Sequence, residues 1–173
     1  MASLTVHSVL RRLRRSESGA ETIEFALTLP LLLLVVLGIV EFGFVFQQYE
    51  VVTNAAREGA RMASLSTYGT TNATRVTNAQ FRVNQYLTAA GLDTASATVC
   101  VGPNDSTCTG AITQTALPGP GGCVWTVRVS VAYAHPVIFV GGIIRYFGGS
   151  WPGTLTLRAR STMRTEAAAG LCP

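Results

Sequence analysis

The sequence predicts an α+β fold: a long N-terminal transmembrane helix continues into an external head with a second amphipathic helix and a small antiparallel sheet of about three strands. Three observations support it. Residues 25–40 form an apolar run without charge, and apolar residues then recur every three to four positions. After Gly91 the period changes to two. We therefore expect a cytoplasmic basic leader at 1–19, a transmembrane and extended helix at 20–65, and a head at 66–173.

The composition shows an excess of apolar residues and argues against a nucleic-acid partner. Of the 173 residues, 48% are hydrophobic and only 13% are charged, whereas a soluble domain is about a quarter charged. All 13 basic residues are arginine, and after residue 19 nine arginines stand against eight acids. Because a nucleic-acid surface needs a basic stripe across the folded domain, we expect no nucleic-acid partner.

The apolar run is long enough to cross a membrane. Residues 25–46 make about 33 Å of helix, against a hydrocarbon core of about 30 Å. The arginines before the run place the N-terminus in the cytoplasm and the residues after about 48 outside; they are Arg11, Arg12, Arg14 and Arg15. A cleaved secretory signal would have a shorter apolar core, so the plain alternative is an uncleaved signal anchor.

The helix is expected to continue beyond the membrane, because residues 47–65 contain no proline. Pro30 should loosen it near residues 26–30. Arg57, Glu58 and Arg61 lie on faces where they can pair locally. One face carries only small side chains that let another backbone approach closely, namely Val52, Ala56, Gly59, Ala60 and Ala63.

The head is predicted to begin with a second helix and to continue as a sheet. Thr71 or Asn72 can cap this helix, and Gly91 suits the left-handed position after its end. Residues 103–123 are rich in glycine, proline, serine and threonine, which predicts a long surface loop. Alternation and β-branched residues predict antiparallel strands at 96–101, 124–133 and 154–165.

The connection at 136–153 is unusually rich in valine, isoleucine and phenylalanine. One interpretation is a loop that folds over the sheet and completes the core. The other is an apolar patch for a neighbouring subunit or for the outer membrane leaflet. Composition favours the first interpretation and leaves the second open.

Four cysteines, Cys100, Cys108, Cys123 and Cys172, fall on the predicted external side, where an even number favours two disulfides. In a hairpin the start of the second strand lies beside the end of the third, which favours Cys123 with Cys172 and leaves Cys108 to pair with Cys100. Cys100 with Cys123 is the rival pairing. No C-x-x-C spacing is present, so we expect no metal.

Catalytic residue types are scarce in the predicted head. It holds two aspartates, Asp93 and Asp105, one histidine, His135, and no lysine. A Ser-His-Asp or paired-carboxylate site has almost no candidates, and no glycine-rich phosphate loop follows a strand. We expect neither an enzyme nor a cofactor.

Three segments carry a resemblance to a known family. They are GAETIEFAL at 19–27, NAAREGARMAS at 54–64 and LTLRARSTMRTE at 155–166. The first resembles the processing site of type IV pilin-like proteins, and the three together resemble the TadE-like minor pseudopilins of the Tad (Flp) pilus system. Phe25 stands where major pilins often have tyrosine. The most specific match comprises Ala56, Arg57, Glu58, Gly59, Ala60 and Arg61.

The resemblance implies that a prepilin peptidase cuts between Gly19 and Ala20 and removes the arginine cluster. The helix could then leave the membrane for an assembly. Glu24, next to Phe25, would then pair with the new amino group of Ala20, on its own chain or on a neighbour. The plain interpretation of Glu24 is a helix-start carboxylate favoured by the helix dipole.

The function implied is that of a minor pseudopilin that contributes to pilus initiation, assembly or tip function. Its place would be the bacterial cytoplasmic (inner) membrane, as a single-pass protein with its head outside. The implied partners are the prepilin peptidase, other Tad pilins and pseudopilins, the inner-membrane assembly platform and membrane lipid. The alternative is an unprocessed bitopic protein whose external domain binds a ligand or a surface.

Overall fold

The computed structural model describes residues 17–65, 71–103, 105, 108–116, 123–146, 148–150 and 153–165. Most of the predicted leader, Cys172 and the side chain of Cys123 lie outside this part of the chain. The contacts divide the chain into two compact units. The first unit comprises Met1–Phe42 and Ile138–Trp151, and the second comprises Gly43–Val137 and Pro152–Pro173.

Helix α2 runs from Glu17 to Ser64 without interruption and contributes to both units. Leucine and alanine, which dominate much of it, are strong helix formers. Pro30 lies inside the helix, and its missing N–H is tolerated in an otherwise apolar helix. The predicted long N-terminal helix is therefore confirmed, with its C-terminal end within one residue of the expected position.

Helix α3, Asn72–Ala89, has both predicted end signals. The Thr71 side chain accepts a hydrogen bond from the backbone N–H of Thr74 at 3.2 Å. At the other end Gly91 has φ of +75°, and the N–H of Leu92 donates to the carbonyl of Leu87 at 2.9 Å. A left-handed glycine with this bond is the usual way of closing a helix. A short 3-10 turn, η2 (Thr94–Ser96), leads into the sheet.

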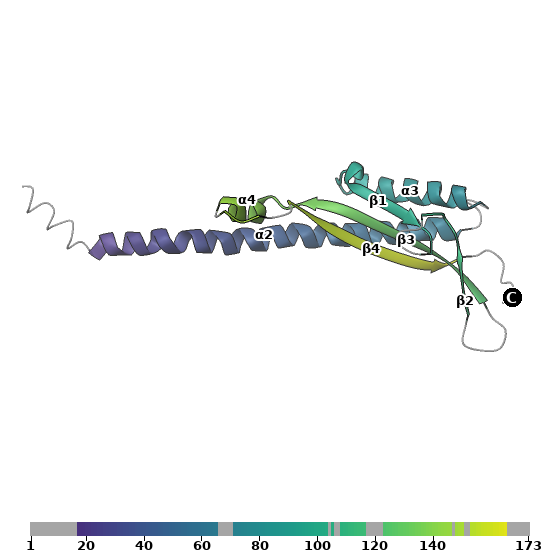
Figure 1. Ribbon diagram of the computed structural model, residues 1–173, viewed down its shortest axis with the longest axis horizontal. Coiled ribbons are helices and arrows are strands. Elements are labelled where there is room, and N and C mark those ends of the chain that lie inside the picture. The colour runs from purple at the N-terminus through teal and green to yellow at the C-terminus, as the bar shows by residue number, and fades with distance from the viewer. Residues whose placement is uncertain are drawn as a thin grey trace, which may run out of the picture. The chain divides into compact units, whose positions relative to one another are not determined.

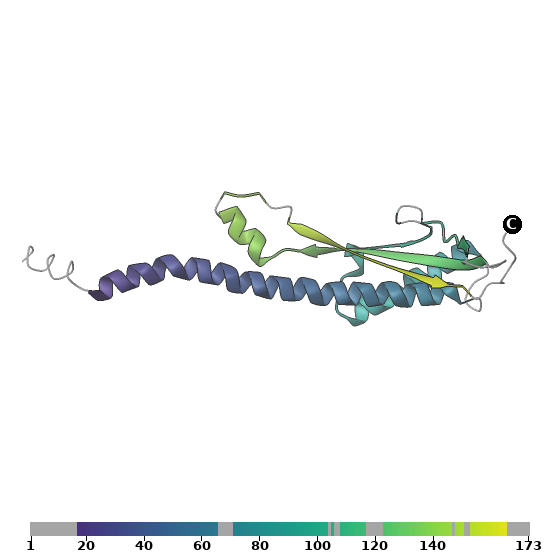
Figure 2. The same ribbon diagram turned by 90° about the horizontal axis from the view of Figure 1, so that it is seen from below.

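The sheet is built around one long strand, β3 (Cys123–Pro136). Strand β4 (Thr154–Arg164) runs antiparallel along one edge, from the pair Thr126–Arg164 to the pair Pro136–Thr154. Strands β1 (Ala97–Val101) and β2 (Thr113–Ala116) pair with different halves of the other edge. Figure 1 labels the four strands, and Figure 2 shows β3 and β4 crossing as a twisted pair. The predicted α+β class is confirmed.

Strand β2 corrects the prediction that residues 103–123 form only a surface loop. Strand β3 is longer than the predicted 124–133, and β1 pairs only with its residues 129–133. Residues 123–126 of that edge are paired by β2, in the register Thr113–Thr126 to Ala116–Cys123. The segment is rich in threonine, which suits a strand.

A second correction concerns residues 136–153. They contain a helix, α4 (Phe139–Tyr146), and none of its residues is buried. The interpretation as a loop that completes the core over the sheet is therefore wrong. Its apolar residues recur at helical spacing, with Val140, Ile143 and Ile144 half-buried. Helix α4 belongs to the first unit, together with the N-terminal part of α2.

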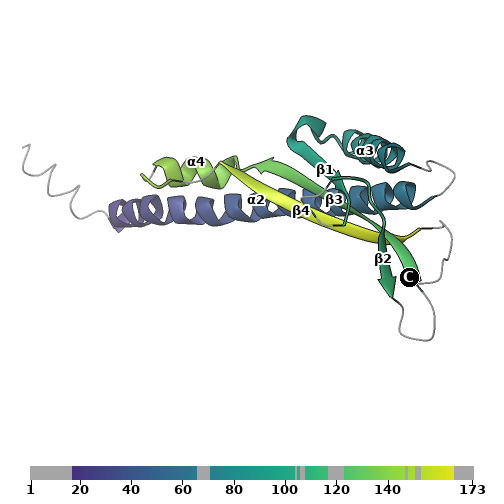
Figure 3. The same ribbon diagram turned by 45° about the vertical axis from the view of Figure 1, so that its right-hand side comes forward.

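The hydrophobic core of the second unit is formed by α2, α3 and one face of the sheet. Figures 1 and 3 show α3 alongside the C-terminal part of α2. A Cβ atom at Gly59 of α2 would lie 2.6 Å from Cγ2 of Val83 on α3 and 3.3 Å from Cγ1 of Val129 on β3. Helix α2 thus meets both neighbours at a residue without a side chain.

Candidate functional site

Gly19 and Ala20, the predicted cleavage residues, lie in the first turn of α2, which begins at Glu17. A Cβ atom at Gly19 would meet no atom within 4 Å. A protease cleft takes an extended chain, so the predicted cleavage would require this turn to unwind. Glycine makes unwinding easier, because it is about 1 kcal/mol less favourable than alanine in a helix, and the ends of helices open most readily.

Glu24 and Phe25 follow on the exposed surface of the same helix, with Phe25 62% exposed. Large apolar side chains remain exposed from Ile23 to Phe46. By length and composition α2 can cross a membrane, and none of the residues in its most apolar stretch is buried. This much exposed apolar surface needs lipid or protein around it.

The six residues from Ala56 to Arg61 divide between the inside and the outside of the second unit. Ala56, Gly59 and Ala60 are buried, as the sequence predicts for a face of small residues. Arg57 and Arg61 are exposed, and Glu58 is half-buried. The small residues let α3 and β3 approach, and Glu58 contacts Arg82 of α3.

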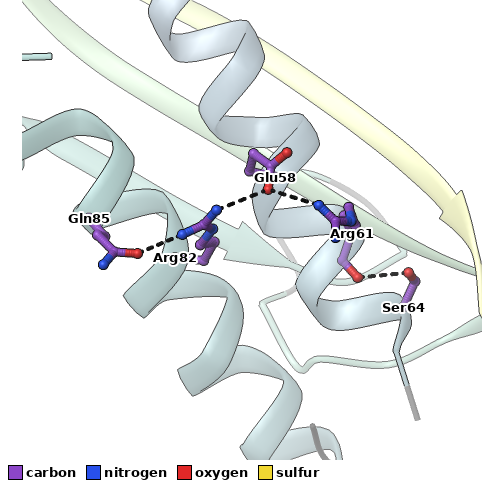
Figure 4. A network of polar contacts seen from close by, with 5 residues as sticks. All are labelled: Glu58, Arg61, Ser64, Arg82 and Gln85. Atoms are coloured by element: carbon purple, nitrogen blue, oxygen red, sulfur yellow. Dashed lines mark hydrogen bonds and ion pairs between the residues drawn. The ribbon is translucent and has the colours of Figure 1, made fainter. Parts of the chain in front are cut away.

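Glu58 is the centre of a polar network that joins α2 to α3 (Figure 4). Its Oε2 lies 3.7 Å from Nη1 of Arg61 and 3.4 Å from Nη2 of Arg82. Arg82 also donates to Oε1 of Gln85 at 2.7 Å, and Ser64 donates to the carbonyl of Arg61 at 2.8 Å. The local pairing expected for Glu58 and Arg61 is confirmed. Exposed pairs of this kind contribute about 0.2–1 kcal/mol each.

Arg75 is a structural residue that the sequence analysis missed. It is buried on α3, and its Nη1 donates at 2.8 Å to the backbone carbonyl of Ala63 in the last turn of α2. The last carbonyls of a helix have no partner within the helix, so a buried guanidinium is well matched to one of them. The available signal was spacing: Arg75 precedes Ala79, Val83 and Leu87 in steps of four on the buried face.

Glu41, also missed, lies within the apolar part of α2 and is only 6% exposed. Its carboxylate accepts hydrogen bonds from three consecutive backbone N–H groups: Ile138 at 3.1 Å, Phe139 at 2.7 Å and Val140 at 3.3 Å. An ionised carboxylate at the centre of a membrane helix costs about 2.5–3.5 kcal/mol. Three donors at the start of α4 and the dipole of that helix offset such a cost.

Comparison with protein families supports the identity of α2. Residues 19–61 match the family model described as TadE-like protein. This segment is TadE-like. The match begins at the predicted cleavage residue and ends at Arg61, so the resemblance expected for residues 19–27 and for Ala56 to Arg61 is confirmed. The third similar segment, 155–166, lies outside the match. Searches of the curated proteins and of the solved structures gave no significant match.

Outside the TadE-like segment, a disulfide joins Cys100 of β1 to Cys108, with their Cα atoms 4.7 Å apart. This is the expected partner of Cys100, and the rival pairing of Cys100 with Cys123 is wrong. The pairing of Cys123 with Cys172 stays a prediction, because it lies outside the described residues. The N–H of Thr165 donates to the carbonyl of Trp125 at 2.8 Å, so the end of the described chain runs beside the start of β3.

The loop closed by this disulfide is held on the sheet by polar contacts. Asp105 accepts a hydrogen bond from Oγ of Ser130 at 2.7 Å and lies 3.4 Å from Nη2 of Arg160. Arg128 donates to the carbonyl of Pro103 at 2.8 Å. The hydrogen bond from Ser130, followed by the positive charge of Arg160, lowers the pKa of Asp105 below its ordinary value of 3.8.

An open hollow of about 610 Å³ adjoins this loop in the second unit. Its lining combines small residues, including Ser130, Ala132 and Ala134, with Arg158 and Arg160 and with Asp105 as its carboxylate. Small side chains and two arginines suit a surface contact. Tyr49 and Thr53 of the TadE-like segment also line this hollow.

Proposed function

We propose that this chain is a minor pseudopilin of a Tad-type pilus. In this proposal a prepilin peptidase cuts after Gly19, α2 holds the protein in the inner membrane with the head outside, and the mature subunit contributes to initiation, assembly or tip function. Its partners are then other Tad pilins and pseudopilins and the membrane assembly platform. The role is structural and needs no catalytic group.

The observation that carries the proposal is the TadE-like helix itself. One continuous helix exposes large apolar side chains in its N-terminal half and buries small ones beyond residue 51. The first half suits lipid or a bundle of similar helices, and the second half anchors a folded head. A subunit that must move from a bilayer into a fibre needs a helix that can exchange one apolar environment for another.

Glu24 gives the proposal a specific contact. Ala20 and Glu24 are four residues apart and therefore neighbours on one face of a helix. Cleavage after Gly19 would create an ammonium group at Ala20, within reach of the Glu24 carboxylate of the same chain or of a neighbour. Both groups would lie at the edge of an apolar bundle, where an unpaired charge is costly. Their pairing would stabilise the docked form of a cleaved subunit. An uncleaved subunit would lack this ion pair and would dock less favourably.

The test is the variant Glu24→Gln in the native host. It keeps the shape of the side chain and removes the charge, so the ammonium loses its partner at a cost of about 3–5 kcal/mol if the site is buried. We expect the protein to be cleaved and inserted normally, to lose co-purification with other pilus subunits, and to support few pili. Immunoblots, affinity purification and electron microscopy measure these three properties.

The matched control is Glu21→Gln, which removes an equal charge from the same exposed part of α2. We expect it to have a much smaller effect. Wild-type piliation in the Glu24→Gln strain would reduce Glu24 to a helix-start residue and would remove the central contact of the proposal. Equal defects in both variants would point to total charge instead of a specific pair.

A further inference from the structure

We propose that α4 is an interfacial membrane helix, lying in the outer leaflet beside the part of α2 that leaves the bilayer, and that Glu41 is the residue that sets its depth. The occupant of its exposed apolar surface is phospholipid. This inference rests on the proposed membrane anchoring by α2. All the residues that carry it belong to the first unit.

The position of Glu41 along α2 places α4 near the membrane boundary. Glu24 and Glu41 are separated by about 25 Å of helix axis, slightly less than the thickness of a hydrocarbon core of about 30 Å. If Glu24 lies at the cytoplasmic edge, Glu41 lies just inside the external edge. The start of α4 is bound to Glu41 by three backbone hydrogen bonds, so α4 begins at the same depth.

The side chains around α4 suit that depth. Ile138 is 66% exposed and Tyr146 is 86% exposed, with Phe139 between them at 38%. They add to the exposed apolar surface of the first unit, which on α2 runs from Ile23 past Glu41 to Phe42. Tyrosine is enriched where membrane meets water, and the exposed Arg145 in the last turn can reach lipid phosphates.

Hydrogen bonds to the Glu41 carboxylate explain how the short helix α4 can be stable at the membrane boundary. Backbone groups at a helix start must be satisfied within the protein when water is scarce, and Glu41 satisfies three of them. The same bonds compensate the carboxylate for its loss of water. The contact therefore satisfies both the buried backbone N–H groups and the buried carboxylate. It also fixes the N-terminal end of α4 to the turn of α2 that contains Glu41.

Tryptophan quenching in vesicles tests the proposal. The full chain is reconstituted in vesicles of phosphatidylethanolamine and phosphatidylglycerol that contain phosphatidylcholine brominated either near the headgroup or near the chain end. Three variants each add one indole to the parent protein: Ile138→Trp on the proposed interfacial segment, Leu33→Trp in the span, and Phe81→Trp, an exposed aromatic of α3 in the second unit. The emission of the parent is subtracted from each.

We expect Ile138→Trp to be quenched most by shallow bromines and Leu33→Trp most by deep ones, whereas Phe81→Trp shows no quenching above the parent. Adding Glu41→Ala to Ile138→Trp should reduce the preference for shallow bromines, and the same change should leave Leu33→Trp unaffected. Quenching of Leu33→Trp without quenching of Ile138→Trp would overturn the interfacial helix and leave the membrane anchor intact. Absence of quenching in both would overturn the anchor as well.

Discussion

Gly59 shows how much of the head depends on one missing side chain. In Gly59→Ala the new Cβ would lie 2.6 Å from Val83 and 3.3 Å from Val129, so α3 or β3 must shift. Overpacking of this kind costs about 1–3 kcal/mol. We expect the free energy of unfolding of the detergent-solubilised full chain to fall by that amount, measured by denaturant titration with near-ultraviolet circular dichroism.

Gly43→Ala is the matched control, because Gly43 lies in the same helix and a Cβ there would meet no atom within 4 Å. Alanine is the better helix former by about 1 kcal/mol, so this change should leave stability equal or slightly higher. A similar loss of stability in both variants would show that the close approach at Gly59 is unimportant.

Asp105 gives a pH dependence whose sign follows from its pKa. The folded-state pKa lies below the ordinary 3.8 because Ser130 donates a hydrogen bond to the carboxylate and Arg160 lies beside it. Its stabilisation is therefore present above pH 4 or so and is lost as the pH falls through the folded pKa. We expect wild type to be slightly more stable than Asp105→Asn at neutral pH, with the difference vanishing in acid. A difference that grew in acid would contradict this assignment.

At the residue scale, pattern predicted the buried small residues and missed two buried charges. A face of small side chains is visible in the spacing of Ala56, Gly59 and Ala60, since periodicity reports burial directly. Arg75 and Glu41 were missed because their partners are backbone groups. A carbonyl or N–H group leaves no trace in the sequence, so such a contact appears only when the fold is known.

At the scale of elements, end signals and alternation predicted the helices α2 and α3 and the strands β1, β3 and β4. Strand β2 and helix α4 escaped prediction for different reasons. Strand β2 exists because β3 offers an open half-edge, which is a tertiary cause. Helix α4 is short, contains two glycines and begins three residues after a proline, so its apolar composition was compatible with a loop.

The remaining cysteines provide a prediction at this scale. The bond from Thr165 to Trp125 holds the last described residue of the chain beside the start of β3. We expect non-reducing peptide mapping of the exported protein to recover Cys123 joined to Cys172, in addition to Cys100 joined to Cys108. Replacing Cys123 and Cys172 together by serine should lower the free energy of unfolding by about 2–4 kcal/mol. A free thiol at Cys123 in native protein would contradict the pairing.

At the scale of the whole molecule, α2 connects two chemical environments through one TadE-like segment. Its N-terminal part offers apolar side chains to the surroundings, and its C-terminal part is integrated into a head with a disulfide. The sequence predicted this difference between the two parts of α2, because hydropathy and side-chain size change along the helix.

Cleavage after Gly19 is central to the proposed function, because it would release the arginine cluster and create the Ala20 amine that the proposed assembly contact requires. Intact-mass and N-terminal peptide analysis of the protein, extracted from membranes of a host with an active prepilin peptidase, tests it most directly. The account predicts a mature chain that begins at Ala20, and a full-length form that persists in Gly19→Leu. A membrane-extracted chain that still carries the residues up to Gly19 would contradict it.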